Sequence, residues 1–286
     1  MTRRSWIASA SAASLAASRE PAFTFVHVTD LHIQPELRAA ERCRACFSAI
    51  NRERPDFVIA GGDLVFDALA VPRRRARLLF DLYRETARRI EAPLHNVLGN
   101  HDVFGLYERS GVLPSEEDYG KKMYEDRIGR RYYSFDFQGW RFIILDSIGL
   151  TPDRLYIGAV DPGQLEWLRA VLAAAGKSRP VVVVTHVPLS TGVLQWMMPK
   201  HDPRRIVVQN ASDVLELLHQ YNVKAVLQGH THVCEKIDYR GCQYVTSGSV
   251  CGESWRGPKW GVHPEGFGLL RVQGETLTWT YRTYAS

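Results

Sequence analysis

The chain has 286 residues, of which 45% are apolar and 23% are charged, and its formal net charge is +5. A chain of this size and composition can bury a substantial core and form one large domain or two small ones. The charge is too mild to indicate a protein that binds nucleic acid, and it falls to +3 without Arg3 and Arg4.

The first eighteen residues, MTRRSWIASASAASLAAS, place two arginines ahead of an uncharged stretch rich in alanine and serine. This layout predicts an export signal over residues 1–20, and its Thr-Arg-Arg-x-Trp-Ile segment resembles a twin-arginine signal, whose cargo crosses the membrane folded. The alternative is a disordered tail on a cytoplasmic protein. The stretch is too short to span a bilayer, and no later segment is predicted to be transmembrane. We therefore expect a periplasmic or otherwise exported protein.

From Phe23 onward, short β-rich runs alternate with longer helical patterns, which predicts βαβ units around a sheet. Residues 21–286 are expected to form a single α/β domain. Two more strands should flank the hairpin turn Gln138-Gly139. The other elements expected in the first half are strands at 23–28, 56–61 and 94–99, and helices near 36–52, 73–90 and 115–127.

In the second half, Pro162 opens a helix that runs to Ala175, since proline suits an early helical position. The apolar run 179–186 suits a strand buried on both faces. Asn210 is expected to cap a helix that ends near residue 221, ahead of a strand at 223–230. Turns at Arg240-Gly241 and Gly274 then predict an antiparallel C-terminal third.

The five cysteines have no spacing that predicts a zinc module. Buried free thiols are the expected state. In an exported protein, a Cys234–Cys242 disulfide across a hairpin is the alternative. The remaining cysteines are Cys43, Cys46 and Cys251.

Five predicted strands end in polar side chains. Such residues gather beyond the carboxyl ends of strands in α/β sheets, so we expect them to meet at one edge. In extended backbone, i,i+2 pairs point to the same side. Carboxylate, imidazole and amide ligands without thiolate suit Mn, Fe, Zn or Mg. The candidate ligands are Asp30, His32, Asp63, Asn100, His186, His230 and His232, whereas core or surface roles are expected for His27, His95, His201, His219 and His263.

The segments DLH, GGDLV, GNHD, TH and GHTH, in this order and spacing, resemble the signature of the calcineurin-like metallophosphoesterase superfamily. The resemblance covers about residues 23–250. It implies a β-sandwich flanked by helices, in four layers α/β/β/α, that holds two divalent metal ions, Mn, Fe or Zn. It further implies one ion bound by Asp30, His32 and His232, a second bound by Asn100, His186 and His230, and Asp63 bridging both.

The same resemblance implies phosphoester hydrolysis by in-line attack of a metal-bridging hydroxide. Two neighbouring ions lower the pKa of a water and clamp phosphoryl oxygens. His101 is then expected to stabilise the transition state and protonate the leaving alkoxide. Gly99, the first residue of the GNHD segment, is expected to permit a tight backbone turn.

Phe66 marks a departure from two branches of the superfamily. It stands where the protein phosphatases have an aspartate that orients the catalytic histidine and where purple acid phosphatases have a metal-binding tyrosine. A calcineurin-type protein phosphatase and an Fe(III)–tyrosinate centre are therefore disfavoured, and Asp67 or Asp102 is the candidate to orient His101. The motifs look closest to the bacterial branch that contains cyclic nucleotide phosphodiesterases.

Two segments are candidates for substrate contact. Residues 188–203 carry Trp196, Met197 and Met198, and residues 251–268 mix aromatic and basic side chains. Aromatic faces stack on bases and basic groups hold phosphate, whereas the alternatives are core packing and an apolar or lipid-facing pocket. The candidate contacts are Asn100, Trp196, Trp255, Arg256, Lys259 and Trp260.

We thus expect a metal-dependent hydrolase of a small phosphodiester. A phosphomonoesterase of the same superfamily and a non-catalytic metal-binding scaffold are the alternatives. A nuclease acting on long nucleic acids is disfavoured, because basic runs are missing and the net charge is mild. Oligomeric state and metal identity are left open.

Overall fold

The computed structural model describes residues 20–198 and 200–284. The export signal predicted for residues 1–20 lies, apart from Glu20, outside the described residues. Within those ranges no helix is both long enough and apolar enough to cross a membrane.

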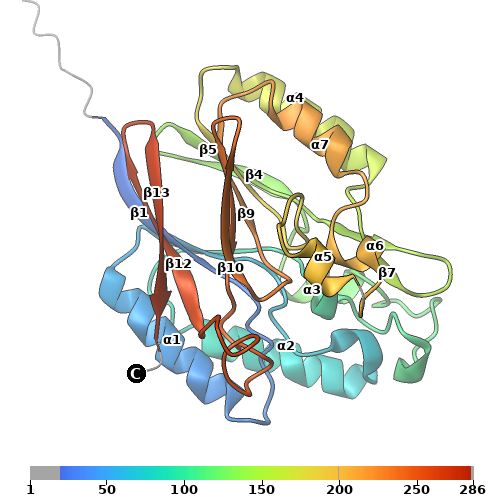
Figure 1. Cartoon of the computed structure of the whole chain (residues 1–286). Coiled ribbons are helices and arrows are strands. Elements are labelled where there is room, and N and C mark those ends of the chain that lie inside the picture. The colour runs from blue at the N-terminus through green and yellow to red at the C-terminus, as the bar shows by residue number, and fades with distance from the viewer. Residues whose placement is uncertain (1–19, 199, 285–286) are drawn as a thin grey trace, which may run out of the picture.

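The first sheet has five strands in the order β13-β12-β1-β2-β3. β1 pairs in parallel with β2, and β2 with β3, whereas β12 and β13 add antiparallel strands on the other side of β1. Two helices link the parallel strands and cover the outer face of this sheet (Figure 1). The bounds are β1 Ala22–Val28, α1 Ala39–Glu53, β2 Phe57–Ala60, α2 Arg73–Ala87, β3 Leu94–Asn96, β12 Gly266–Gln273 and β13 Thr276–Thr283.

The second sheet has six strands in the order β10-β11-β9-β8-β5-β4. Its four central strands are parallel, and β10 and β4 run antiparallel at its two edges. Helices α4 and α7 lie on its outer side (Figure 1). The bounds are β4 Tyr133–Phe137, β5 Trp140–Ile144, α4 Pro162–Ala175, β8 Val181–Val184, α7 Ala211–Leu218, β9 Val223–Gln228, β10 Cys234–Tyr239 and β11 Cys242–Ser247.

The connections carry smaller elements. β6 and β7 form a separate two-stranded sheet. The short helices α5 and α6 lie beside β7 (Figure 1). The bounds are α3 Lys122–Arg127, β6 Ile148–Leu150, β7 Tyr156–Gly158, α5 Leu194–Met197 and α6 Pro203–Ile206.

Alternating side chains divide the core into layers. Along β1, Phe25 belongs to the cluster between the two sheets, and Val26 belongs to the cluster under the helices. Along β8, Val182 and Val183 divide in the same way, so this strand is buried on both faces as predicted. Phe25 stacks on Phe57 with 5.0 Å between ring centroids at the centre of the inter-sheet core. The predicted α/β/β/α sandwich is confirmed.

Three local predictions need correction. The helix expected over 115–127 is confined to α3, and turns precede it. Asn210 occupies the N-cap position of α7 as predicted, but its side chain makes no capping hydrogen bond, because it binds the main-chain N–H and carbonyl of Val160 instead. The C-terminal third is only partly antiparallel, since β11 pairs in parallel with β9.

The alternative of a Cys234–Cys242 disulfide is also wrong. The register of β10 and β11 places Cys234 opposite Ser247 and Cys242 opposite Tyr239, at opposite ends of the hairpin. All five cysteines are free thiols, and four of them are buried.

Candidate metal centre

The candidate ligands sit on sharply turned backbone immediately after the strands. Five of the seven have a positive φ, a conformation that costs about 1–3 kcal/mol for a residue other than glycine. Main-chain hydrogen bonds hold the turns, such as the one from Asp30 N to Gly62 O at 3.0 Å. The φ angles are 55° at Asp30, 41° at His32, 51° at Asp63, 71° at His230 and 61° at His232.

The i,i+2 spacing predicted that each pair points to one side because its backbone is extended. The structure shows a different cause. Asp30 with His32, and His230 with His232, do not lie in extended backbone, since both members of each pair are left-handed. The two residues of each pair nevertheless face the same edge of the sandwich, because the chain turns at both positions. The local strain is concentrated where the polar side chains meet.

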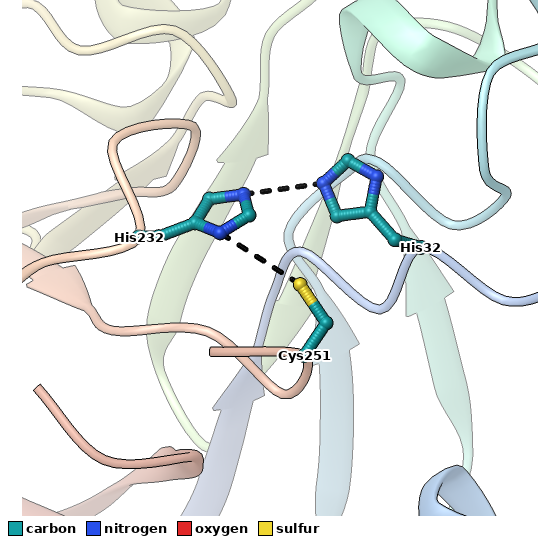
Figure 2. A group of neighbouring side chains, drawn as sticks. All are labelled: His32, His232 and Cys251. Carbon is teal, nitrogen blue, oxygen red and sulfur yellow. Dashed lines mark hydrogen bonds between the residues drawn. The ribbon is translucent and has the colours of Figure 1, made fainter. Parts of the chain in front are cut away.

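The first group of candidate ligands comprises Asp30, His32 and His232. The Nε2 atoms of the two histidines are 3.2 Å apart (Figure 2). Asp30 Oδ1 lies 3.3 Å from Nε2 of His232. Ligand atoms about 2.1 Å from a tetrahedral metal ion are separated by about 3.4 Å, so this spacing fits one ion.

The second group of candidate ligands comprises Asn100, His186 and His230. Ligand atoms of Asp63, His186 and His230 lie within 4.8 Å of one another, so Asp63 lies between the two groups. Asp63 Oδ2 is 3.2 Å from Nε2 of His186 and 3.4 Å from Nε2 of His32. Among the described residues, Oδ1 of Asn100 is buried without a hydrogen-bond partner, and Nε2 of His186 is buried with no hydrogen bond of good geometry beside Asp63. Buried polar atoms are rarely left unpaired, so these two are suited to bind a cation.

Main-chain carbonyls fix three of the four histidine rings. Nδ1 of His186 donates to Gly61 O at 2.9 Å, Nε2 of His230 to Arg205 O at 2.8 Å, and Nδ1 of His232 to Gly252 O at 2.6 Å. Such a bond orients the other ring nitrogen toward a metal ion and fixes the tautomer.

Electrostatics favour charged carboxylates in this buried cluster. Burial opposes ionisation of Asp30, but His232 and His186 outweigh it and lower the pKa of Asp30 to about 2. Burial also disfavours the charged form of His186, yet Asp63 and Asp30 raise the pKa of His186 to about 9. Burial and the neighbouring His186 lower the pKa of His230 to about 4. The carboxylates thus attract positive charge to the site, whether protons or metal ions.

Cys251 approaches the first group but from another side. Its Sγ lies 3.7 Å from Nδ1 of His232, whereas His32 faces Nε2 of the same ring (Figure 2). Asp30 also lies on the Nε2 side. The thiol therefore does not complete the oxygen and nitrogen ligand set.

Gly99 is needed for close packing rather than for a turn. Its backbone is extended, with φ −102° and ψ 172°, which any residue adopts. A Cβ atom there would lie 2.0 Å from the main-chain nitrogen of Asp63. The glycine allows the GNHD loop to pack directly against the strand end that carries Asp63.

His101 lies beside the ligand cluster. Its main-chain N–H donates to Asp63 Oδ1 at 2.8 Å, and its ring centroid is 4.6 Å from that of His32. Asp67 Oδ1 lies 3.9 Å from Nδ1 of His101, too far for a hydrogen bond. Asp102 instead accepts from the N–H groups of Val65 and Gly99. Of the two candidates to orient His101, only Asp67 approaches the ring.

A cavity of about 390 Å³ opens over the cluster. Among the residues predicted for substrate contact, Lys259 lines it, and Asn100 lies buried at the metal site. Trp196, Arg256 and Trp260 do not line it. The lining includes His32, Phe66, His101, Tyr156, Met197, Lys200, His201, Arg205, His230, His232 and Glu253.

Trp255 is placed in the core rather than at the cavity. Only 4% of it is exposed, and its Nε1 donates to the carbonyl of His32 at 2.9 Å. The guanidinium of Arg42 covers its ring at 4.9 Å. Trp255 thus supports the loop that carries the candidate ligand His32. For this residue, core packing, the alternative to substrate contact, is the observed role.

Several cavity residues were not singled out from the sequence, among them Arg205, Tyr156 and His201. Arg205 lies just beyond the segment 188–203, Tyr156 lies on a strand that the sequence did not indicate, and His201 was expected to have a core or surface role. The pair Asp202-Pro203 is a helix-start signal that could have marked α6, which carries Arg205. Nothing in the local pattern shows that these side chains face the cavity.

Comparisons with known proteins agree with this architecture. The sequence model of the calcineurin-like phosphoesterase family matches residues 23–234. The chain is 28% identical over 252 residues to the serine/threonine-protein phosphatase CPPED1 of Bos taurus, covering 87% of this chain and 74% of that protein. It is 29% identical over 218 residues to a Synechococcus protein named "Probable cyclic nucleotide phosphodiesterase", covering 73% of each.

Solved structures share the fold. A dimetal phosphatase from Danio rerio superposes with a TM-score of 0.65 at 20% identity, covering 93% of this chain and 98% of that one. The motifs, the sandwich and the family match lead to one assignment. The chain belongs to the calcineurin-like phosphoesterase family and is a metal-dependent phosphoester hydrolase.

Proposed function

We infer that this protein hydrolyses a small phosphodiester with two divalent ions bound at the strand-end cluster. The observation that carries this inference is the position of Asp63, whose Oδ2 lies 3.4 Å from Nε2 of His32 and 3.2 Å from Nε2 of His186. A carboxylate between two sets of ligand atoms is suited to bridge two ions. The buried, unpaired Oδ1 of Asn100 supports the second set.

The donor set fits Mn, Fe or Zn, which bind carboxylate, imidazole and amide groups together. Asp30, His32 and His232 would hold one ion, and Asn100, His186 and His230 the other, with Asp63 shared. When bound, such a pair activates water and neutralises charge on the phosphoryl group. The carbonyls of Gly61, Arg205 and Gly252 keep the histidine rings in the orientation that this requires.

His101 is the proposed proton donor to the leaving alkoxide. It lines the cavity, and its side chain is 28% exposed, so it is accessible to a bound ester. The bond from its main-chain N–H to Asp63 fixes its position relative to the cluster. A positioned general acid contributes about 10²–10⁴-fold to the rate.

Two observations support a diester over a monoester. Phe66 lines the cavity where the protein phosphatases of the superfamily have an aspartate, and several relatives are named as cyclic nucleotide phosphodiesterases. The relatives named as protein phosphatases favour the monoester alternative.

The test compares kcat/KM for bis(4-nitrophenyl) phosphate and 4-nitrophenyl phosphate after the chain from residue 21 onward is reloaded with Mn(II). We expect a preference for the diester that His101→Ala reduces. A preference for the monoester would identify a phosphatase instead. Turnover of neither substrate by metal-loaded protein, with no effect of His101→Ala, would favour the non-catalytic scaffold.

We also propose that the protein is exported through its twin-arginine-like leader. The support is the order of Arg3 and Arg4 ahead of an uncharged stretch. In a bacterial host, Arg3→Lys with Arg4→Lys is expected to move the protein from the periplasmic to the cytoplasmic fraction. An unchanged distribution would contradict the proposal.

A further inference from the structure

Arg205 lies in the cavity wall beside the second group of candidate ligands. It belongs to α6, and its main-chain carbonyl accepts the hydrogen bond from Nε2 of His230 at 2.8 Å. Its side chain lines the same cavity as His101 and His230. The backbone of this residue therefore supports the candidate metal site, and its side chain is available for a different role.

Two tyrosines hold the guanidinium in place. Nη2 of Arg205 donates to the hydroxyl of Tyr107 at 2.6 Å, and Cζ lies 4.3 Å from the ring centroid of Tyr156. Tyr156 in turn packs its ring against His230, with 6.1 Å between centroids. Stacking and hydrogen bonding fix the plane of a guanidinium, which makes it suitable for directional binding of an oxyanion.

The charge of Arg205 has no carboxylate partner among the described residues. Asp202, the nearest acidic residue along the chain, pairs with Arg204 at 2.8 Å. Nε of Arg205 is buried and has no hydrogen-bond partner in the part of the chain that the structure describes. A partly buried cation without a counter-charge is unfavourable, so an anion in the cavity would compensate the charge of the guanidinium.

We propose that Arg205 binds a phosphoryl oxygen of the substrate and sets its orientation over the cluster. This rests on the proposed function, and it adds a phosphate-binding residue that the motifs do not contain. The planar fork of arginine matches two oxygens of a phosphate, whereas lysine provides only a point charge.

The test uses inorganic phosphate as the probe and Mn(II)-loaded protein throughout. Phosphate affinity is measured by calorimetry for the wild type, Arg205→Met and Arg205→Lys, and metal content is measured in the same samples. The matched control is Arg204→Met, because Arg204 is on the same helix, is exposed and does not line the cavity.

We expect Arg205→Met to weaken phosphate binding by about ten- to a hundredfold, the range for a hydrogen bond to a charged group. Arg205→Lys should restore part of the affinity, and Arg204→Met should match the wild type. Metal content should stay unchanged in all variants, because the carbonyl that holds His230 remains. With bis(4-nitrophenyl) phosphate, the loss should appear mainly in KM.

Equal phosphate affinity of Arg205→Met and Arg204→Met would overturn the proposal. Loss of metal in Arg205→Met would also overturn it, since the residue would then act only through His230. Wild-type protein that binds phosphate through Arg205 and hydrolyses neither aryl ester would uphold the phosphate site while contradicting the proposed hydrolase function.

Discussion

The cluster of candidate metal ligands and the cavity wall above it are built in different ways. The cluster comes from residues directly after strands, held by main-chain bonds such as those from His186 to Gly61 and from His232 to Gly252. The wall comes from the loop segments around α5 and α6 and from residues 251–265, which present few of their aromatic side chains to the cavity. The sheets thus determine the candidate chemistry, and the loops determine what can reach it.

The largest effect is expected from Asp63→Ala, which removes the carboxylate shared by both ligand groups. We expect kcat/KM to fall by at least about a thousandfold, or about 4 kcal/mol, together with loss of bound metal. Kinetics and metal analysis of the same preparation check this. Asp238→Asn, at an exposed position, is the control. Full metal content with normal kinetics in Asp63→Ala would show that the two groups do not form one centre.

His101→Ala separates proton transfer from metal binding. We expect about 10²–10⁴-fold lower kcat with unchanged metal content. The loss should be larger for an alkyl leaving group, which needs a proton, than for 4-nitrophenolate. Asp67→Asn should have a much smaller effect, because its carboxylate is 3.9 Å from Nδ1. Equal losses with both leaving groups would argue against a general acid.

Two tryptophans test the cavity wall. Trp255→Ala should reduce the free energy of unfolding by about 3–5 kcal/mol, since it leaves a cavity beside the carbonyl of His32. Trp196→Ala should change it by no more than about 0.5 kcal/mol, because Trp196 is 79% exposed. Chemical denaturation measures both. A similar effect at the two sites would contradict the difference in burial.

His27 gives a smaller effect that depends on pH. Burial lowers the pKa of His27 to about 3, below its ordinary value of 6.5. As the pH falls, the histidine is therefore protonated in the unfolded chain before it is protonated in the folded protein. The free energy of unfolding decreases by up to about 1.4 kcal/mol per pH unit between pH 6.5 and 3. His27→Gln should lose less stability over this range, as urea denaturation at pH 6.5, 5.5 and 4.5 would measure. If the free energy of unfolding decreased equally in the wild type and in His27→Gln, His27 would not titrate between pH 6.5 and 4.5.

Much of the fold was predictable because its signals are local. The buried run of β8 and the hairpin of β4 and β5 follow from residue patterns, and the strand-end motifs identify side chains that the sheets bring together. The cavity wall was not predictable in this way. Trp255 and Trp260 are five residues apart in one loop, yet only Trp255 is buried, because α1 and Arg42 happen to cover it. Such contacts depend on distant segments.

Arg205 illustrates the same limit. Its neighbours Tyr107 and Tyr156 are 98 and 49 positions away in the chain, and the intervening strands decide that they meet. A local pattern can identify a helix start at Asp202-Pro203, but it cannot say what the following arginine faces.

The left-handed backbone at the candidate ligands has a consequence for how this centre can evolve. Aspartate, asparagine and histidine tolerate a positive φ far better than branched or bulky residues do. They are also the residue types that provide the oxygen and nitrogen ligands of the cluster. At Asp30, His32, Asp63, His230 and His232, backbone shape and metal chemistry therefore restrict the accessible substitutions to nearly the same few residues. New specificities can then arise by changes in the loops while these few residue types are kept at the ligand positions.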